Sequence, residues 1–436
     1  MSKERNRVQP PRGTQDLFDD YLKKIERVTA VMTKVARSYG FCRVDTPVLE
    51  HLEVFTITDS ARVEKCYTFK DKSGRDLVMR PDINAPLSRF VINNCLSEPV
   101  PIKLFFVDKV FRYRHSRKRE FRMFGVESFG DASFDADAEG IRLVSEIVEE
   151  LGLPEIMVEY ANPQIYYKYL EELLLKRHLP VEDAPNLLRE LRFAKTPEQK
   201  IFAMTARSLG QNEIDQLMLM LEQNTDTDSF SVLNAAAGNS DVLAQELVEI
   251  ERFRDTLAAC GLSRFGFNLG ALHGAGFYSG VTYQLRFQGT DLEVGDGGRY
   301  DNFVELLSGK KLPATGIGLG VERLIRFCDE LGISIVNPKS GVLVVTSDTV
   351  SIRPVLKELR AAGAIIECVV PCDKRPVTVH YGRSKGYKFI VFLSTSTDGS
   401  GLFSLETVDV GANEKYTAVQ KVNMSQLRDI LSKVLS

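Results

Sequence analysis

The chain has 436 residues, of which 44% are hydrophobic and 26% charged, and its formal net charge at pH 7 is -3. This length exceeds what one hydrophobic core usually organises, so we expect a globular protein with two or three domains. A slightly acidic chain has no overall field that attracts nucleic acid, so such a partner would have to meet a local basic patch.

The cysteines and histidines are scattered along the sequence. None of the seven cysteines is in a CxxC pair, and the five histidines are isolated from one another. The pattern predicts reduced thiols and no metal site built by protein side chains. No signal-like apolar run precedes residue 17, and no apolar stretch of about 18 residues or more follows. We therefore expect a cytoplasmic protein.

The first predicted block covers residues 1–160. Apolar residues at helical spacing predict a helix over 17–39, and the alternating segment 41–50 predicts a strand bent at Pro47. Short segments rich in aromatic and β-branched residues follow, and they predict an antiparallel meander. A second helix is expected over 135–152.

The rest of the chain divides into three parts. Residues 161–262 have an almost purely helical pattern, typical of an inserted helical subdomain. Over 263–332 the first block resumes, with a glycine-rich turn at 295–301 and a glycine-flanked helix at 314–332. Alternating strands and helices predict a separate α/β domain over 338–436. The whole pattern predicts an α+β protein.

A basic cluster separates two of the predicted strands. It consists of Arg112, Arg114, Arg117, Lys118, Arg119 and Arg122. Arginine binds phosphate and carboxylate groups through paired N–H donors, so the cluster fits an ATP tail or an RNA backbone. A solvated basic turn is the alternative interpretation.

Another arginine, Arg323, follows three glycines that alternate along the chain, Gly316, Gly318 and Gly320. Such glycines would admit a ligand to the backbone or let a helix pack tightly against a sheet.

Several of these segments resemble, in order, the motifs of the histidyl-tRNA synthetase family of class II aminoacyl-tRNA synthetases. They are PRGTQD, SYGFCRVDTPVLE, MRPD with NAPLSRF, VFRYR with REFRMFGVESFG, GGRYD and ATGIGLGVERL. Near the carboxyl end, VHYGRSKGYKFIVFL is similar to the family's anticodon-binding domain. The resemblance implies a class II antiparallel sheet core flanked by helices, a helical insertion, an anticodon-binding-like α/β domain, and a homodimer built on the helix at 17–39 and the strand around Pro47.

The resemblance also implies a ligase that uses ATP with Mg²⁺ to activate histidine. Arg112 would hold the α-phosphate and the amino-acid carboxylate, and Arg323 would stack on adenine. Glu127 would face the imidazole, and Asp82 would hold the substrate ammonium. The other expected ATP contacts are Arg114, Phe121 and Arg299, and the other expected amino-acid contacts are Met123, Phe277 and Tyr278.

Some positions depart from the family pattern. Arg114 stands where an acidic residue usually accepts from adenine, and an arginine offers no acceptor. Met123 stands in place of a glutamine, and the basic loop is short. In LHGAGFYSG at 272–280, His273 replaces a catalytic arginine, Gly276 an aspartate and Phe277 a tyrosine. His273 would serve by gaining a proton beside phosphate, or it is a packed structural histidine.

Three functions therefore stay open. The first is a divergent ligase for histidine or a related amino acid, with tRNA contacting the carboxy-terminal domain and the basic loop. The second is a non-catalytic histidine sensor, a regulatory subunit whose partner would be the catalytic subunit of ATP phosphoribosyltransferase. The third is an enzyme that activates an amino acid for an acceptor other than tRNA. The closely spaced FRYR, EF and GVES fit the second, and the carboxy-terminal domain favours the first.

Overall fold

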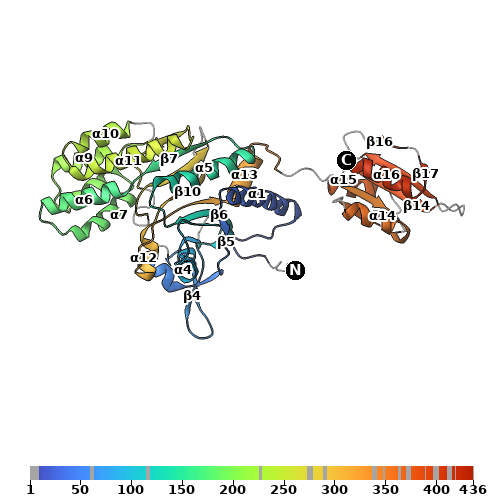
Figure 1. The fold of residues 1–436 in the computed structure, drawn as a ribbon, viewed down its shortest axis with the longest axis horizontal. Coiled ribbons are helices and arrows are strands. Elements are labelled where there is room, and N and C mark those ends of the chain that lie inside the picture. The colour runs from blue at the N-terminus through green and yellow to red at the C-terminus, as the bar shows by residue number, and fades with distance from the viewer. Residues whose placement is uncertain are drawn as a thin grey trace, which may run out of the picture. The chain divides into compact units, whose positions relative to one another are not determined.

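The protein is described here by a computed structural model (Figure 1). It describes residues 9–58, 63–113, 118–224, 228–272, 278–287, 292–335, 341–346, 349–361, 365–369, 375–387, 389–395, 402–409, 415–417 and 419–435. The chain divides into two units, residues 1–335 and 336–436.

A large sheet organises the first unit. Its strands, in the order β1-β5-β6-β11-β10-β9-β7-β8, are β1 (Cys42–Arg43), β5 (Ile102–Phe111), β6 (Glu120–Phe129), β11 (Ala314–Gly320), β10 (Glu293–Arg299), β9 (Thr282–Phe287), β7 (Ile156–Ala161) and β8 (Phe265–Phe267). The pairs β1–β5 and β7–β8 are parallel, and the other neighbours are antiparallel. The expected α+β class with an antiparallel sheet core is confirmed.

Three helices pack together on one face of this sheet, α1 (Asp19–Ser38), α5 (Phe134–Glu150) and α13 (Val321–Glu330). Helix α1 buries residues three or four apart, including Ile25, Val28 and Met32, which confirms the predicted helix. In α5, a Cβ atom at Gly140 would lie 3.4 Å from Ile317 of β11. We call this side of the sheet the helix-covered face.

A smaller layer contacts the opposite face of the sheet. It contains the three-stranded sheet β2-β4-β3, made of β2 (Leu49–His51), β4 (Asp76–Met79) and β3 (Tyr67–Lys70), and the helices α2 (Leu52–Thr58), α4 (Asn84–Asn94) and α12 (Asn302–Ser308). Its apolar side chains share a core with Leu104 and Phe106 of β5.

The predicted single meander is wrong, because its strands belong to two sheets and α4 lies between them. This helix buries Ala85, Leu87, Ser88 and Val91, a helical spacing that the sequence does display. The strand bent at Pro47 is likewise divided, into β1 at the edge of the large sheet and β2 in the small one.

Two glycine-rich segments differ from prediction. Residues 293–299 form β10 rather than a turn, and residues 314–320 form β11, so that helix α13 begins only at Val321. A Cβ atom at Gly297 would lie 2.3 Å from the Gly316 carbonyl oxygen and 2.4 Å from the Tyr283 ring. Glycine is thus required here for close packing inside a sheet, not for a turn.

Between β7 and β8 the chain forms a group of helices, coloured green in Figure 1. They are α6 (Gln164–Lys176), the short η1 (Val181–Asp183), α7 (Ala184–Phe193), α8 (Pro197–Thr205), α9 (Gln211–Leu221), α10 (Ser229–Ala237) and α11 (Asp241–Ala259). The Ser240 hydroxyl caps α11 by accepting from the amide of Leu243.

The second unit is an α/β domain, as expected. Its strands are β12 (Val342–Val345), β13 (Ile366–Val369), β14 (Phe389–Thr395), β15 (Phe403–Asp409), β16 (Lys415–Tyr416) and β17 (Gln420–Val422), and its helices are α14 (Thr349–Ala361), α15 (Arg375–Ser384) and α16 (Met424–Leu435). Strand β12 pairs in parallel with both β13 and β14. Among the helices of the described residues, none has the length and apolar character needed to cross a membrane.

Candidate functional site

The register of β6 and β11 places two side chains, those of Met123 and Glu127, over a row of glycines. Met123, Gly125 and Glu127 lie opposite Gly320, Gly318 and Gly316, respectively. Paired residues of antiparallel strands point to the same side, so all six lie on the face that the α1, α5 and α13 helices do not cover. We call it the site face.

The glycines make room for their neighbours. A Cβ atom at Gly316 would lie 1.5 Å from the Glu127 Oε2 atom, and one at Gly318 would lie 2.8 Å from the Met123 Cε atom. Real Cβ atoms essentially never approach another heavy atom within 3.0 Å, so a side chain at either position would displace its neighbour. The side chains of Met123 and Glu127 therefore lie flat across β11.

Glu127 is a buried carboxyl group with two polar partners. Its side chain accepts hydrogen bonds from the Tyr300 hydroxyl and from Asn84 Nδ2, the latter at 3.2 Å. Burial raises the pKa of Glu127 well above its ordinary value, and the nearby charge of Asp82 raises it further. A buried carboxyl of this kind is a natural acceptor for an N–H group of a ligand.

Arg112 directly follows β5, at the end of that strand away from Leu104, the partner of Glu127. Its Nε donates to the Pro81 carbonyl oxygen at 2.6 Å, and its NH2 group lies 3.8 Å from the Met123 sulfur. The guanidinium carbon is 5.3 Å from the centre of the Phe121 ring. The structure therefore brings the predicted site residues Arg112, Phe121 and Met123 together, and the buried Asp82 follows the proline that anchors Arg112.

Arg323 lies next to Gly320, the residue of β11 that pairs with Met123. It lies in the first turn of α13, and its Cβ is 3.3 Å from the position of a Cβ atom at Gly320, the partner of Met123. Its NH1 group donates to both the carbonyl and the carboxylate of Glu293, at 3.0 and 2.7 Å. Two guanidinium groups thus flank the Met123–Gly320 pair, and this donor set fits an anionic ligand such as a polyphosphate.

Tyr278 forms a further part of this site. A Cβ atom at Gly298, whose φ is 155°, would lie 3.0 Å from Tyr278 Cδ1. The Tyr278 carbonyl accepts from Gln164 Nε2 of helix α6 at 3.0 Å. Its partly buried side chain packs against the core that residues of α4 and α12 help to form.

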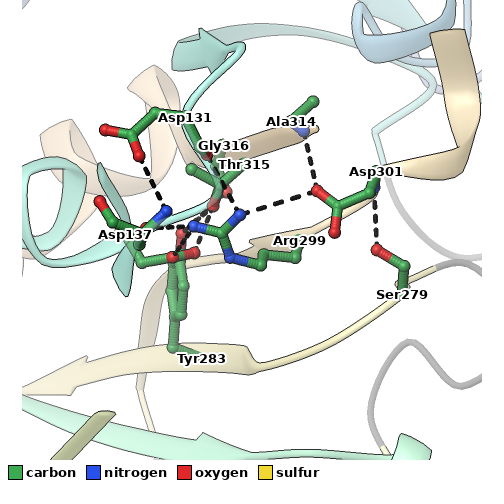
Figure 2. A network of polar contacts seen from close by, with 10 residues as sticks. Asp131, Asp137, Ser279, Tyr283, Arg299, Asp301, Ala314, Thr315 and Gly316 are labelled. Atoms are coloured by element: carbon green, nitrogen blue, oxygen red, sulfur yellow. Dashed lines mark hydrogen bonds and ion pairs between the residues drawn. The ribbon is translucent and has the colours of Figure 1, made fainter. Parts of the chain in front are cut away.

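Arg299 lies on the helix-covered face, away from these residues (Figure 2). It is 5% exposed, and its NH2 group is 2.6 Å from Asp137 of helix α5. These partners favour a structural role for Arg299, and its contact with ATP stays a prediction. His273, Phe277 and Arg114 lie outside the described residues.

Asn84 and Tyr300, which hold Glu127, and Asp137, which holds Arg299, were not predicted as site residues. Tyr300 stands inside the GGRYD segment, so the sequence did carry a signal for it. Asn84 likewise opens the NAPLSRF segment. Asp137 carries no such signal, because only the fold brings it to Arg299. Among the described residues no group of three or more His, Cys, Asp or Glu side chains is placed to hold a metal ion.

Comparison with known proteins gives the family. A family model described as histidyl-tRNA synthetase matches residues 13–324. The chain belongs to the histidyl-tRNA synthetase family. The matched residues include the large sheet and the helical insertion. They also include the site residues Glu127 and Arg323.

Two relatives from Pyrobaculum species carry the name histidine--tRNA ligase. The protein of Pyrobaculum neutrophilum is 33% identical over 392 residues, covering 88% of this chain and 91% of the relative. That of Pyrobaculum arsenaticum is 33% identical over 320 residues, covering 72% and 74%. These identities place the chain in a family of aminoacyl-tRNA ligases.

Solved structures share the fold of this histidyl-tRNA synthetase family member. One from Bacillus halodurans, described as an ATP phosphoribosyltransferase regulatory subunit/histidyl-tRNA synthetase, has a TM-score of 0.75 at 20% identity, covering 90% of this chain and 99% of that one. Histidyl-tRNA synthetase from Nostoc sp. PCC 7120 has a TM-score of 0.74 at 18% identity, covering 98% and 99%.

Proposed function

We propose that the chain binds histidine and ATP on the site face, joins them as an aminoacyl adenylate and passes the amino acid to tRNA. The observation that carries this proposal is the position of Glu127. Its buried carboxyl lies on the same strand as Met123, which Arg112 and Arg323 flank. A nitrogen-recognising group and two anion-binding groups therefore share one surface.

Each residue has a chemical role in this proposal. Glu127, oriented by Tyr300 and Asn84, accepts an imidazole N–H. Arg112 holds the amino-acid carboxylate against the α-phosphate, and Arg323 exchanges Glu293 for the nucleotide. Positioned guanidinium groups stabilise the negative charge that develops on phosphate oxygens in the transition state.

The proposed first step forms the aminoacyl adenylate from histidine and ATP alone. A carboxylate oxygen of histidine attacks the α-phosphorus, the bond from that phosphorus to the bridging oxygen breaks, and pyrophosphate leaves. In the second step a ribose hydroxyl of tRNA attacks the carbonyl carbon, the bond from that carbon to the phosphate oxygen breaks, and AMP leaves while the hydroxyl proton passes to the phosphate or to water. Mg²⁺ carried by the phosphates would neutralise part of their charge, and the described residues contribute Arg112 and Arg323 to the same end.

We propose two macromolecular partners. A second copy of the chain would associate through the segment around Pro47 and the adjoining surface of α2 and the small sheet, where Val48, Leu49, Ile57 and Phe69 are 39–47% exposed. Helix α1, also expected at this interface, buries its apolar residues within its own chain. The acceptor tRNA would contact the basic loop after Arg112 and the carboxy-terminal domain.

A regulatory role is the second candidate. The likeness to the Bacillus halodurans structure supports it, as do two sequence departures, Arg114 in place of an adenine acceptor and His273 in place of a catalytic arginine. A regulator of this kind would bind histidine through Glu127 and form no adenylate.

Pyrophosphate exchange with each of the twenty amino acids decides between the two. A ligase exchanges pyrophosphate with histidine present, and Glu127→Gln should lower this exchange strongly, because a neutral amide oxygen accepts an imidazole N–H more weakly than a carboxylate does. The variant His273→Arg should raise the rate, since a fixed guanidinium replaces a partly protonated imidazole. Histidine binding by calorimetry with no exchange by either protein rejects the ligase and supports the regulator.

A further inference from the structure

A buried ion pair joins the sheet to helix α5 directly behind the proposed pocket. Arg299 NH2 is 2.6 Å from Asp137 Oδ2, and Asp137 Oδ1 accepts from the Thr315 hydroxyl at 2.5 Å. Arg299 also donates to the carbonyl oxygens of Asp131 and Ser133, just before the first turn of α5. Figure 2 shows the guanidinium between Asp137 and Asp301.

None of these polar groups belongs to the site face. Arg299 pairs with Thr315 across β10 and β11, whereas Gly298 pairs with Gly316, which pairs with Glu127. Successive residues of a strand point to opposite sides, so the ion pair and the carboxyl of Glu127 lie on opposite faces of the same strands. Any influence of Arg299 on the pocket passes through its chain neighbours.

These neighbours are Tyr300 and the segment with Tyr278 and Ser279, which belong to the proposed amino-acid site. Tyr300, the next residue, donates its hydroxyl to Glu127. On the other side, the Ser279 amide donates to the Arg299 carbonyl at 2.7 Å, and the Asp301 amide donates to the Ser279 hydroxyl at 2.8 Å. Ser279 follows Tyr278, so both tyrosines depend on the position of residues 299–301.

A buried ion pair such as Asp137–Arg299 adds little net stability to a fold. Desolvating two charges costs about as much free energy as their attraction returns, and a buried pair is often replaceable by apolar side chains without loss of stability. What such a pair supplies is a defined geometry, because the Arg299 NH1 and NH2 groups meet Asp131, Ser133 and Asp137 in one arrangement only. Here that arrangement fixes the end of β10.

We propose that Asp137 and Arg299 are positioning residues for the amino-acid pocket: by anchoring the end of β10 to α5 they hold Tyr300 against Glu127 and Tyr278 over Gly298. The inference rests on the proposed binding of histidine at Glu127. It assigns the ion pair a role in affinity for the amino acid and none in affinity for ATP.

Calorimetry on the full chain tests this with two ligands. Asp137→Asn keeps the side-chain shape but loses the charge, and Thr315→Val loses one hydroxyl. We expect Asp137→Asn to weaken histidine binding by about tenfold, an effect of the size that outer-shell partners have at metal sites. Thr315→Val should weaken it less. ATP affinity should stay within about twofold in both, because Arg112 and Arg323 are held by other groups.

The matched control is Glu367→Gln in the second unit. Glu367 also accepts two side-chain hydrogen bonds, from Tyr381 at 2.6 Å and Tyr387 at 2.5 Å. It should leave both affinities unchanged. Thermal unfolding of each variant identifies any that fails to fold, and in that case Thr315→Val decides.

The outcomes are distinct. A parent that binds histidine, with folded variants that bind it equally well, overturns the positioning role alone. Parallel losses of histidine and ATP affinity also overturn it, since they indicate general damage to the fold. A parent that binds no histidine rejects the proposed function and the pocket with it.

Discussion

Gly316 has no side chain, and the carboxyl group of Glu127 occupies the space that one would need. We expect Gly316→Ala to abolish histidine binding, because a Cβ atom there would lie 1.5 Å from Glu127 Oε2. Overpacking of this kind costs about 1–3 kcal/mol of stability. Calorimetry and urea unfolding measure the two effects.

The control for this change is Gly238→Ala at the end of α10, where the nearest atom to a new Cβ is a carbonyl oxygen at 3.5 Å. It should change neither histidine binding nor stability appreciably. Retained binding in Gly316→Ala would show that Glu127 does not face the ligand.

Glu293 competes with any anion for Arg323. The two side chains form an ion pair of 2.7 Å, and both are more than a third exposed. Because exposed ion pairs are weak, Glu293→Gln should raise ATP affinity only modestly, about threefold. Titration with ATP measures it. Glu330→Gln, which removes the partner of Arg326 on the same helix, should leave ATP affinity unchanged; an equal gain there would mean a general charge effect.

At the scale of elements, the buried side chain of Asp137 joins helix α5 to strand β10, and burial makes this carboxyl group costly to ionise. Burial raises the pKa of Asp137 to about 6 from 3.8, although Arg299 and Thr315 lower it. The folded state therefore holds a proton more tightly than the unfolded state between these values. The stabilising contribution is complete below the unfolded pKa and is lost as pH rises through the folded one.

This sign gives a measurable difference between the parent and Asp137→Asn. As pH rises from about 4 to about 6, the free energy of unfolding of the parent should fall relative to that of the variant, which has no proton to lose. Urea unfolding at several pH values measures it. A parent that gains stability over this range would mean that the ion pair with Arg299 more than offsets the desolvation of Asp137.

Periodicity in the sequence predicted α1, the insertion helices and the α/β unit because their apolar residues recur at fixed intervals. Periodicity did not predict β10 and β11. Their glycines leave room for side chains of β6 and β9, and these strands are distant in sequence. The motifs predicted Arg112, Glu127 and Arg323, but the partners of Glu127 and Arg299 come from α4, α5 and the residue that follows β10. No local pattern encodes such tertiary pairings.

At the scale of the whole molecule, the exposed apolar residues of the small sheet predict a dimer. Monomers would expose Leu49, which is 47% exposed, and a second copy would bury it. Light scattering at micromolar concentration should give twice the chain mass for the parent and the chain mass for Leu49→Glu. Leu175→Glu changes a 66% exposed leucine of the insertion and should stay dimeric. A monomeric parent would contradict the proposed interface.

The sheet is built from two stretches of chain that the insertion separates. Strand β6 ends at Phe129, and its partner β11 begins only at Ala314. During synthesis, a ribosome therefore completes all the helices from α6 to α11 before β11 exists. Until then β6 has an open hydrogen-bonding edge, which in other proteins invites pairing with foreign strands. A message cut short within the insertion would yield a product that has Glu127 but lacks Tyr300, Arg323 and the glycines of β11 over which Glu127 lies.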